Sequence, residues 1–508
     1  MPRLVRLSTC SALALGVAAG PAFAELTAQE VWDGMEAGLQ NYGYSVTATE
    51  TTTSEGLLLS DVLLEFAIPE DNSTVEIAVG SIDLDETGDG SVSMTFPASM
   101  PITIDAAPED EDAVNMVLDY ANTDLEIFVS GAPSALTYTY SADALSIALA
   151  ELIVNGETID RDAARFEFII NAMTGTATII TEGATRIAQD LRAESIGYDI
   201  AFNDPESSDT ALISGSAQAL TLDSTTTLPE GFDPSNPESL MASRFLASGK
   251  MGYEEGEMQF AVTEPAGTTN GTTQSGSAAF EFELNDSLLR YDVSASDQSL
   301  RLTGPELPVP VDVSMAQSAF KFTAPITEAD TPQDMVFGLT LGGFEMSDLL
   351  WNMVDPAAAL PRDPATIALD LTGQVTPFVN LLDPAAMAGI EDSGEAPGEL
   401  NSLTLNALTI EAAGAKLGGT GSFTFDNQDL ETFAGFPRPS GELDLTIDGA
   451  NTLIDKLIAM GLLTNEDAMG ARMMMGMFAV PGDGPDNLKS SIQINDQGHV
   501  LANGMRIQ

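Results

Sequence analysis

One serine and one lysine in this sequence have the spacing of a known catalytic pair. Ser318 and Lys321 match the S-x-x-K motif of some serine hydrolases, where the pair opens a helix and shares one helix face. Here the alternation of Phe320 and Phe322 predicts a strand, in which residues 318 and 321 lie on opposite faces. We therefore discard this pair as a nucleophilic site.

The only histidine, His499, lies in a segment from Asp496 to Val500 that predicts a turn between two strands. A lone histidine cannot complete an ordinary zinc site. The sequence also contains no G-x-S-x-G motif that would place a nucleophile for it. We expect His499 to be an exposed turn residue without a catalytic role.

Four residues resemble the start of a calcium-binding EF-hand loop: Asp85, Thr87, Asp89 and Gly90. The twelfth loop position is Phe96, where an EF-hand needs a bidentate glutamate. A tight hairpin explains the same residues, because Thr87 to Gly90 is a strong turn signal. We predict no metal site here.

The remaining chemistry is sparse. The glycine-rich run at residues 418–421 lacks the Gly-Lys-Ser/Thr ending of a phosphate-binding loop, so we predict a hairpin turn there. The 77 acidic residues are too many for any one pair to stand out. The scarcity of histidine, cysteine and lysine removes most side chains used as acids, bases or nucleophiles. We expect no catalytic, cofactor-binding or metal-binding residues, and no enzymatic activity.

Residues 1–24 have the three parts of a secretory signal peptide. Two arginines precede an apolar stretch at residues 12–19, and residues 22–24 form an A-x-A cleavage site. The apolar stretch is shorter than the roughly 20 residues that span a bilayer. Cleavage after Ala24 would remove Cys10, the only cysteine, so the mature chain could form no disulfide. We expect a periplasmic protein without a transmembrane segment in its mature chain.

Most of the chain alternates apolar with polar residues. Segments such as Leu64 to Ile68 and Leu443 to Ile447 have the period of two that predicts antiparallel strands with one buried and one solvated face. The expected fold is mainly β, with large curved antiparallel sheets, a few covering helices and a minor α+β component. The Gly/Thr-rich stretch at residues 266–277 predicts a flexible hairpin loop.

Several helices are expected to cover these sheets. Thr27 and Glu30 form a capping box that begins the first helix. Further helices are predicted from Asn236 to Phe245, over 348–354, over 451–460 and over 465–478. The last of these carries a group of methionines, Met469, Met473, Met474, Met475 and Met477. We interpret them as a pliable face that covers the core, with a lipid- or partner-binding surface as the alternative.

A proline-rich connector at residues 228–237 divides the mature chain in two. We place an N-terminal β-rich region at 25–229 and a C-terminal β-rich region at 230–508, which ends in a helical pair and final strands. The net charge of −59 and the pI near 4.1 argue against nucleic acid and anionic membrane surfaces as partners. Most of this charge is expected on the solvated faces of the strands.

Several segments resemble a bacterial family catalogued as domain of unknown function 2125. The resemblance extends over essentially the whole mature chain and is carried most clearly by residues 351–356, 360–366, 421–427 and 502–506. No activity, cofactor or site is established for that family, so it implies none here. The order of final strands, prolines and helical pair is also similar to the closing region of AsmA-like envelope proteins, which are associated with lipid homeostasis.

Two functions follow as hypotheses. The first is a non-enzymatic envelope protein that binds a lipid or another apolar ligand on a concave sheet face. The alternative is a structural or scaffold protein of the periplasm without a ligand cavity. The sequence identifies neither the ligand nor the oligomeric state.

Overall fold

The computed structural model describes residues 25–41, 43–68, 73–106, 113–204, 207–230, 245–394 and 396–507. The fold is mainly β, with 64% strand and 11% helix. The predicted signal peptide lies outside the described residues, and so does the predicted helix from Asn236 except for Phe245. The expected fold class is confirmed, with one large antiparallel sheet in place of several.

The N-terminal part of the sheet is built from short and long strands. They are β1 (Tyr44–Thr52), β2 (Gly56–Ile68), β3 (Ser73–Val79), β4 (Ile82–Glu86), β5 (Val92–Thr95), β6 (Ser99–Ala106), β7 (Val114–Thr123), β8 (Glu126–Ala132), β9 (Ala135–Val154) and β10 (Glu157–Ile159). Strand β2 includes the predicted segment from Leu64 to Ile68.

The rest of the sheet consists mostly of long strands. They are β11 (Ala164–Ile180), β12 (Thr185–Asn203), β13 (Thr210–Leu228), β14 (Leu246–Glu264), β15 (Gly267–Leu284), β16 (Leu288–Thr303), β17 (Val311–Pro325), β18 (Gln333–Met346), β19 (Ala365–Pro377), β20 (Gly398–Ala412), β21 (Ala415–Asp426), β22 (Arg438–Asp448), β23 (Val480–Pro481), β24 (Asn487–Ile494), β25 (Val500–Ala502) and β26 (Met505–Arg506).

The described residues form five helices: α1 (Ala28–Asn41), α3 (Asp348–Val354), α4 (Pro384–Ser393), α5 (Ala450–Ala459) and α6 (Asn465–Phe478). Four of them confirm the predicted positions. The sequence analysis missed α4, whose alanine-rich segment has little amphipathic pattern. Its ends carry usable signals, since Asp383 caps the first turn and Gly394 adopts the left-handed conformation that ends helices.

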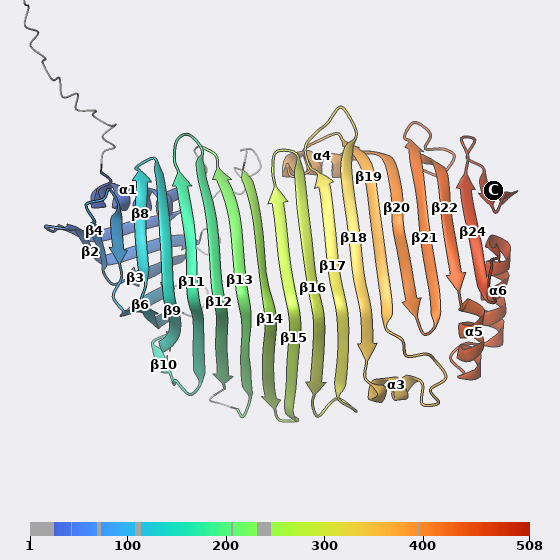
Figure 1. Cartoon of the computed structure of the whole chain (residues 1–508), viewed down its shortest axis with the longest axis horizontal. Coiled ribbons are helices and arrows are strands. Elements are labelled where there is room, and N and C mark those ends of the chain that lie inside the picture. Colours follow the sequence, from blue (N-terminus) through green and yellow to red (C-terminus); the bar gives the residue numbers. More distant parts are fainter. Residues whose placement is uncertain are drawn as a thin grey trace, which may run out of the picture.

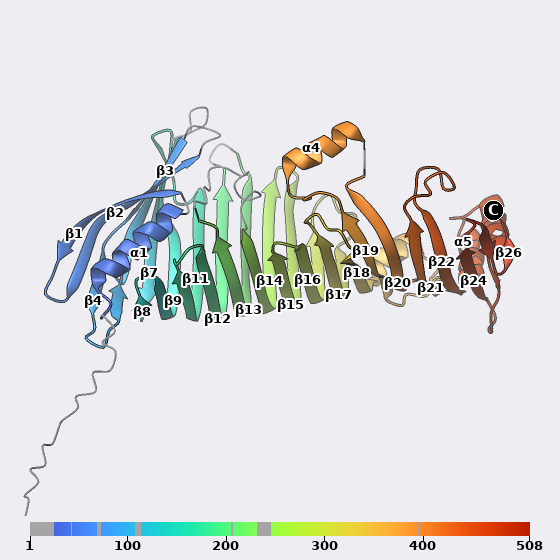
Figure 2. The same ribbon diagram turned by 90° about the horizontal axis from the view of Figure 1, so that it is seen from above.

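Strand β9 joins the two parts of the sheet. One edge of β9 pairs with β8 along its first half and with β7 along its second half, while the other edge pairs with β11. From β8 the pairing runs through β5 and β4 to β2, and from β2 through β3 and β6 back to β7. The N-terminal strands thus form a closed circuit of hydrogen-bonded neighbours, seen at one end of the molecule (Figures 1 and 2).

Helix α1 packs into this closed end. The backbone N–H of Thr27 donates to Glu30 at 2.9 Å, and the N–H of Glu30 donates to the Thr27 hydroxyl at 3.2 Å, which confirms the capping box. Val31 and Trp32 are buried against the strands, and the Trp32 indole N–H donates to Glu50 at 3.1 Å. The hydrophobic core of the described residues lies here, between Leu26 and Leu136.

From β11 to β22 each strand pairs with its neighbours in chain order, and β24, β25 and β26 continue the sheet. The result is an extended meander that occupies most of the length of the molecule (Figure 1). The boundary predicted at residue 229 falls just after β13, which pairs with β14 in the same sheet. The division into two regions stays a prediction.

Two predicted turns are wrong. Residues 267–277 form the first part of β15, and residues 418–421 lie inside β21. Glycine is used in both strands for close packing. A Cβ at Gly271 would overlap the Phe260 ring, and one at Gly419 would meet Leu445 of the neighbouring strand. Pairing on both edges therefore overrides the local preference of glycine and threonine for loops.

Candidate functional site

The structure separates the residues of the S-x-x-K motif. Both lie in β17, and the Ser318 hydroxyl donates to Gln298 at 2.6 Å. The Lys321 ammonium group lies on the opposite face, 3.3 Å from Asp292. The discarded motif is therefore a pair of unrelated strand residues, as expected.

His499 and the EF-hand-like residues lie in turns. His499 lies between β24 and β25 as predicted, but it is half-buried and not exposed as expected, and its backbone N–H donates to the Asn495 side chain at 3.0 Å. The Asp89 carboxylate accepts hydrogen bonds from the Thr87 hydroxyl at 2.6 Å and from the Ser91 hydroxyl at 2.7 Å, in the turn between β4 and β5. Among the described residues, no three His, Cys, Asp or Glu side chains are grouped so that they could hold a metal ion.

A different site emerges from the register of the long strands. Directly paired residues of antiparallel strands lie on the same face of a sheet. One such row crosses eleven consecutive strands, from β12 to β22, with one apolar residue on each strand. Its members are Leu191, Leu222, Met251, Phe280, Val293, Phe320, Leu339, Leu369, Leu408, Gly419 and Leu445. At about 4.8 Å per strand the row extends roughly 50 Å.

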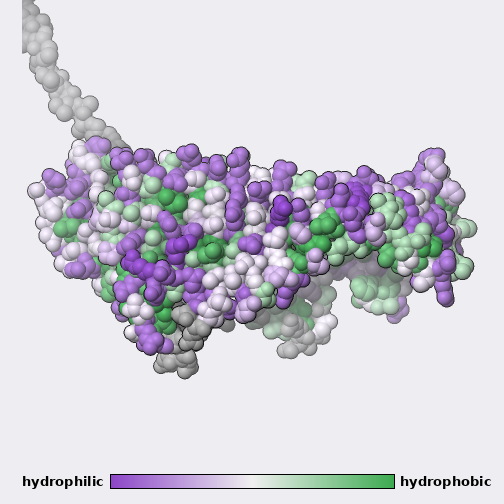
Figure 3. All heavy atoms as spheres, turned by 90° about the horizontal axis from the view of Figure 1, so that it is seen from below, coloured by the Kyte–Doolittle hydropathy of each residue, from purple (hydrophilic) through white to green (hydrophobic). Residues whose placement is uncertain are grey.

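A second apolar row runs beside the first, two residues away on most strands and three residues away on β20, where the register shifts. It contains Phe282, Tyr291, Phe322, Phe337, Leu371, Leu405, Gly421, Leu443 and Ile492. We call the surface formed by these two rows, and by the residues on the same side of each strand, the apolar face. Hydrophobic residues recur along the length of the molecule in Figure 3.

The reverse side of the same strands is charged. The residues between the two apolar rows pair as Asp190, Asp223, Lys250, Glu281, Asp292, Lys321, Gly338 and Asp370. Ion pairs form on this side, including those of Arg192 with Asp190 at 2.9 Å and with Asp223 at 3.1 Å. We call this side the charged face. The sheet is therefore amphipathic across a single layer.

Much of the apolar face is open to solvent. Met251 is 50% exposed, Val293 42% and Ile367 45%. Soluble monomers rarely leave contiguous apolar patches larger than a few hundred Å² exposed, and such patches mark binding surfaces. The sequence analysis predicted one buried and one solvated face per strand, but in the long meander the apolar face is only partly covered.

A line of kinks crosses the long strands. Ala172, Ala219, Glu255, Asp297 and Gly343 have positive φ in the middle of β11, β13, β14, β16 and β18. The pairing is interrupted at the same level, for example between Asn171 and Met173 opposite β9, where the register is unchanged across the gap. Between β13 and β14 the register shifts on either side of Gln218, as in a β-bulge, which bends a strand and increases its twist. The kinks bend the sheet along a line perpendicular to its strands.

Each kink also shifts the alternation by one residue. On β11 the successive residues on the apolar face are Ile170 and Met173, and on β18 they are Leu341 and Phe344. Each pair is three residues apart, where a regular strand would have two. Without this shift, the apolar side chains beyond each kink would turn to the charged face. The kinks therefore keep one continuous apolar face on both sides of the bend. In the sequence, a three-residue step in the alternation of apolar and polar residues recurs at these kinks. This step was the signal that could have predicted them.

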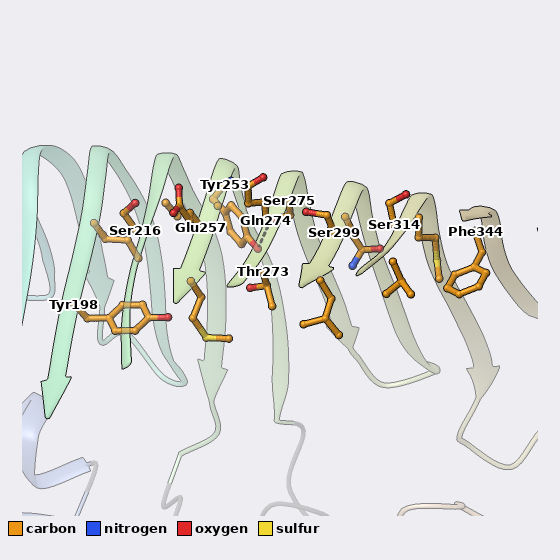
Figure 4. Close-up of a pocket in the computed structure, with 18 residues that line it drawn as sticks. Tyr198, Ser216, Tyr253, Glu257, Thr273, Gln274, Ser275, Ser299, Ser314 and Phe344 are labelled. Carbon is orange, nitrogen blue, oxygen red and sulfur yellow. Dashed lines mark hydrogen bonds between the residues drawn. The ribbon is translucent and has the colours of Figure 1, made fainter. Parts of the chain in front are cut away.

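The larger hollow on the apolar face has a volume of about 570 Å³ and lies at the line of kinks. Figure 4 shows its lining, which includes Tyr198 and Phe344 at opposite ends. The Tyr253 and Ser275 hydroxyls are 3.1 Å apart in the hollow. This hollow therefore combines apolar walls with hydroxyl groups at the bend.

A second hollow, of about 400 Å³, lies between α1 and the strands at the N-terminal end. Met35 and Leu39 of α1 face Ile179 and Ile187 of the sheet across it. Ile187 belongs to the apolar face, two positions from Gln189 on β12, so the face continues into this hollow. We call it the α1 chamber.

The methionines of α6 do not cover a core. Met469 is 67% exposed and Met473 is 66% exposed, and Met474 and Met477 are also exposed. Ala468 is the buried residue of this helix. The prediction of a core-covering methionine face is therefore wrong, because only the small side of α6 packs against the protein.

No helix in the described ranges is both long and apolar enough to cross a bilayer.

The fold and the site define a class of protein: a mainly β protein with one extended antiparallel sheet and an open apolar face. The chain belongs to the DUF2125 family, described as an uncharacterized protein conserved in bacteria, whose model matches residues 253–507. The match covers β14 to β26 and the helices between them, a shorter part than the resemblance in sequence implied. No curated protein and no solved structure matches the chain.

Proposed function

We propose that this protein is a non-enzymatic protein of the bacterial cell envelope that binds a lipid or another apolar ligand on its apolar face. The observation that carries the proposal is the apolar row from Leu191 to Leu445, which continues strand by strand while its reverse side is charged. Burying such a surface against acyl chains is favourable by about 25 cal/mol per Å².

Location in the periplasm is part of the same proposal. The segment at residues 1–24 has the features of a cleavable signal, with cleavage after Ala24. A periplasmic protein would meet acyl chains between the two membranes of the envelope. Cell fractionation with an antibody against the protein tests this location, and recovery in the cytoplasm would contradict it.

The alternative is a scaffold protein without a ligand cavity. Two hollows, of about 570 and 400 Å³, lie on the apolar face and favour ligand binding instead. Both volumes are in the range of small-molecule sites.

The proposal is tested with purified protein incubated with phosphatidylethanolamine–phosphatidylglycerol vesicles, separated from them and analysed by mass spectrometry. We expect bound phospholipid. The double variant Val293→Asn/Phe320→Asn places two amides next to each other on the apolar face, because these residues are paired. This variant should retain several-fold less lipid.

The matched control is Ser294→Asn/Ala319→Asn, which changes the paired neighbours on the charged face. The control should retain as much lipid as the unmodified protein. Absence of lipid from the unmodified protein, or equal losses in both double variants, would contradict the proposal.

A further inference from the structure

The α1 chamber contains a buried hydroxyl group without a partner. Among the described residues, the Tyr138 hydroxyl is one of a few buried side-chain polar atoms that no protein group hydrogen-bonds. Tyr138 lies on β9, paired with Val129 and Ala177, and its side chain lines the chamber. Buried polar groups in proteins are almost always hydrogen-bonded, so this exception calls for an explanation.

The neighbouring tyrosine is different. Tyr140 also lines the chamber, but its hydroxyl donates to the backbone carbonyl of Asp190 at 3.4 Å. Burial raises the pKa of Tyr138 to about 12, so its hydroxyl stays protonated and can donate at neutral pH. The lining of the chamber thus includes one tyrosine whose hydroxyl is bonded to the protein and one whose buried hydroxyl has no protein partner.

The rest of the lining is almost entirely apolar. Apart from the two tyrosines, the polar side chains are Thr181 and Thr185, near one end of β11 and β12. A buried water needs two to four polar partners, and the chamber offers few near an apolar wall. An ionised carboxylate would be costly to bury there, because no cation lines the chamber. An uncharged acceptor on an apolar molecule fits these surroundings best.

Helix α1 leaves room for that molecule. Gly38 faces the chamber, and a Cβ placed on it would have no neighbour within 4 Å. Glycine is unfavourable inside a helix, so its presence at a chamber wall calls for a reason other than helix stability. The space in front of Gly38 belongs to the chamber itself.

We propose that the α1 chamber is the terminal binding site for an ester-linked acyl chain, whose carbonyl oxygen accepts a hydrogen bond from the Tyr138 hydroxyl. This inference rests on the proposed function, since the chain would enter along the apolar face through Ile187. It adds a defined end to that face and a preference for uncharged esters over free fatty acids and alkanes.

The test uses purified protein loaded separately with methyl palmitate, palmitic acid or hexadecane, freed of unbound probe by gel filtration and analysed by mass spectrometry. The unmodified protein should retain the ester best. Tyr138→Phe should retain about fivefold less ester, the loss expected for one hydrogen bond, and as much hexadecane as before. Its Tm should not fall, because the removed hydroxyl has no protein partner.

Tyr120→Phe, on β7 and outside the lining of the chamber, is the matched control and should retain ester at the unmodified level. Gly38→Leu fills the chamber and should retain little of any probe. Gly470→Leu, at an α6 glycine that also has open space, is the control for this change.

Two results would overturn the inference. One is equal loss of ester and hexadecane in Tyr138→Phe. The other is unchanged retention in Gly38→Leu. If these two variants behave like the unmodified protein while Val293→Asn/Phe320→Asn loses lipid, the apolar-face proposal stands and the chamber proposal falls. If the unmodified protein retains no probe and no phospholipid, both fall.

Discussion

The carboxylate of Asp89 accepts hydrogen bonds from residues of its own turn. Its Oδ1 atom accepts hydrogen bonds from the Thr87 hydroxyl and from both the hydroxyl and the backbone N–H of Ser91. These bonds, with the Thr87 hydroxyl first, lower the pKa of Asp89 to about 2.

We predict that Asp89 titrates near pH 2 in an NMR titration, and that Thr87→Val moves the titration toward the usual aspartate value of about 3.9. Because the folded pKa is lowered, the contribution of this carboxylate to stability is present above about pH 4 and is lost as the pH falls through about 2. Titration of Asp89 near pH 4, or a shift of its signal by millimolar calcium, would show that the turn does not hold the carboxylate in this way.

Residue-level features were predictable where the signal is local. The capping box of Thr27 and Glu30 and the opposite faces of Ser318 and Lys321 follow from spacing alone. The unpartnered hydroxyl of Tyr138 was not predictable, because its surroundings come from α1, β8, β11 and β12 as well as its own strand.

Strand kinks are the elements that shape the candidate site. Ala219 has a φ of 50° within β13, a region that a β-branched residue avoids. Leu212, on the same strand, is also exposed, is regularly paired and is not among the positive-φ residues.

Ala219→Val should therefore lower the Tm, with a cost of about 1 to 2 kcal/mol for the left-handed conformation. Leu212→Val is the control and should leave the Tm nearly unchanged, since valine suits an ordinary strand position. Thermal unfolding followed by circular dichroism compares the two. Equal Tm values for both variants would argue against a strained kink at Ala219.

The exposed methionines of α6 allow a second test, of how this helix packs against the protein. Replacing Met469, Met473, Met474 and Met477 by glutamine should leave the Tm within about 1 °C, because surface substitutions usually change stability by less than 0.5 kcal/mol. A fall of several degrees would mean that these side chains pack against the protein.

The sequence predicted most elements because period-two alternation and capping signals are local. It failed at residues 267–277 and 418–421, where glycine and threonine have loop preferences but both strand edges are paired. It could not predict that the strands form a single sheet, since strand order depends on contacts far apart in the chain, such as those of β2 with β4.

The molecule as a whole is strongly acidic. The net charge of −59 creates self-repulsion that salt screens, with a Debye length of about 10 Å at 0.1 M and about 3 Å at 1 M. We predict a higher Tm in 1 M than in 0.02 M sodium chloride. The comparison is made by calorimetry at constant pH, and a flat or falling Tm would contradict it.

The long meander also lacks a thick core of its own. The principal core cluster of the described residues is confined to α1 and the strands up to β9. Stability of the remaining sheet therefore depends on strand pairing and on partly buried apolar rows. A ligand that covers the apolar face would add burial that the protein alone does not provide.

The central claim is that the apolar face contacts acyl chains and the charged face does not. The most direct measurement introduces a photo-cross-linking amino acid at Val293 on the apolar face or at Ser294 on the charged face, irradiates cells that produce the protein and identifies the adducts by mass spectrometry. We predict lipid adducts at position 293 and none at 294. Equal adducts at both positions, or no lipid adduct at 293, would contradict the account.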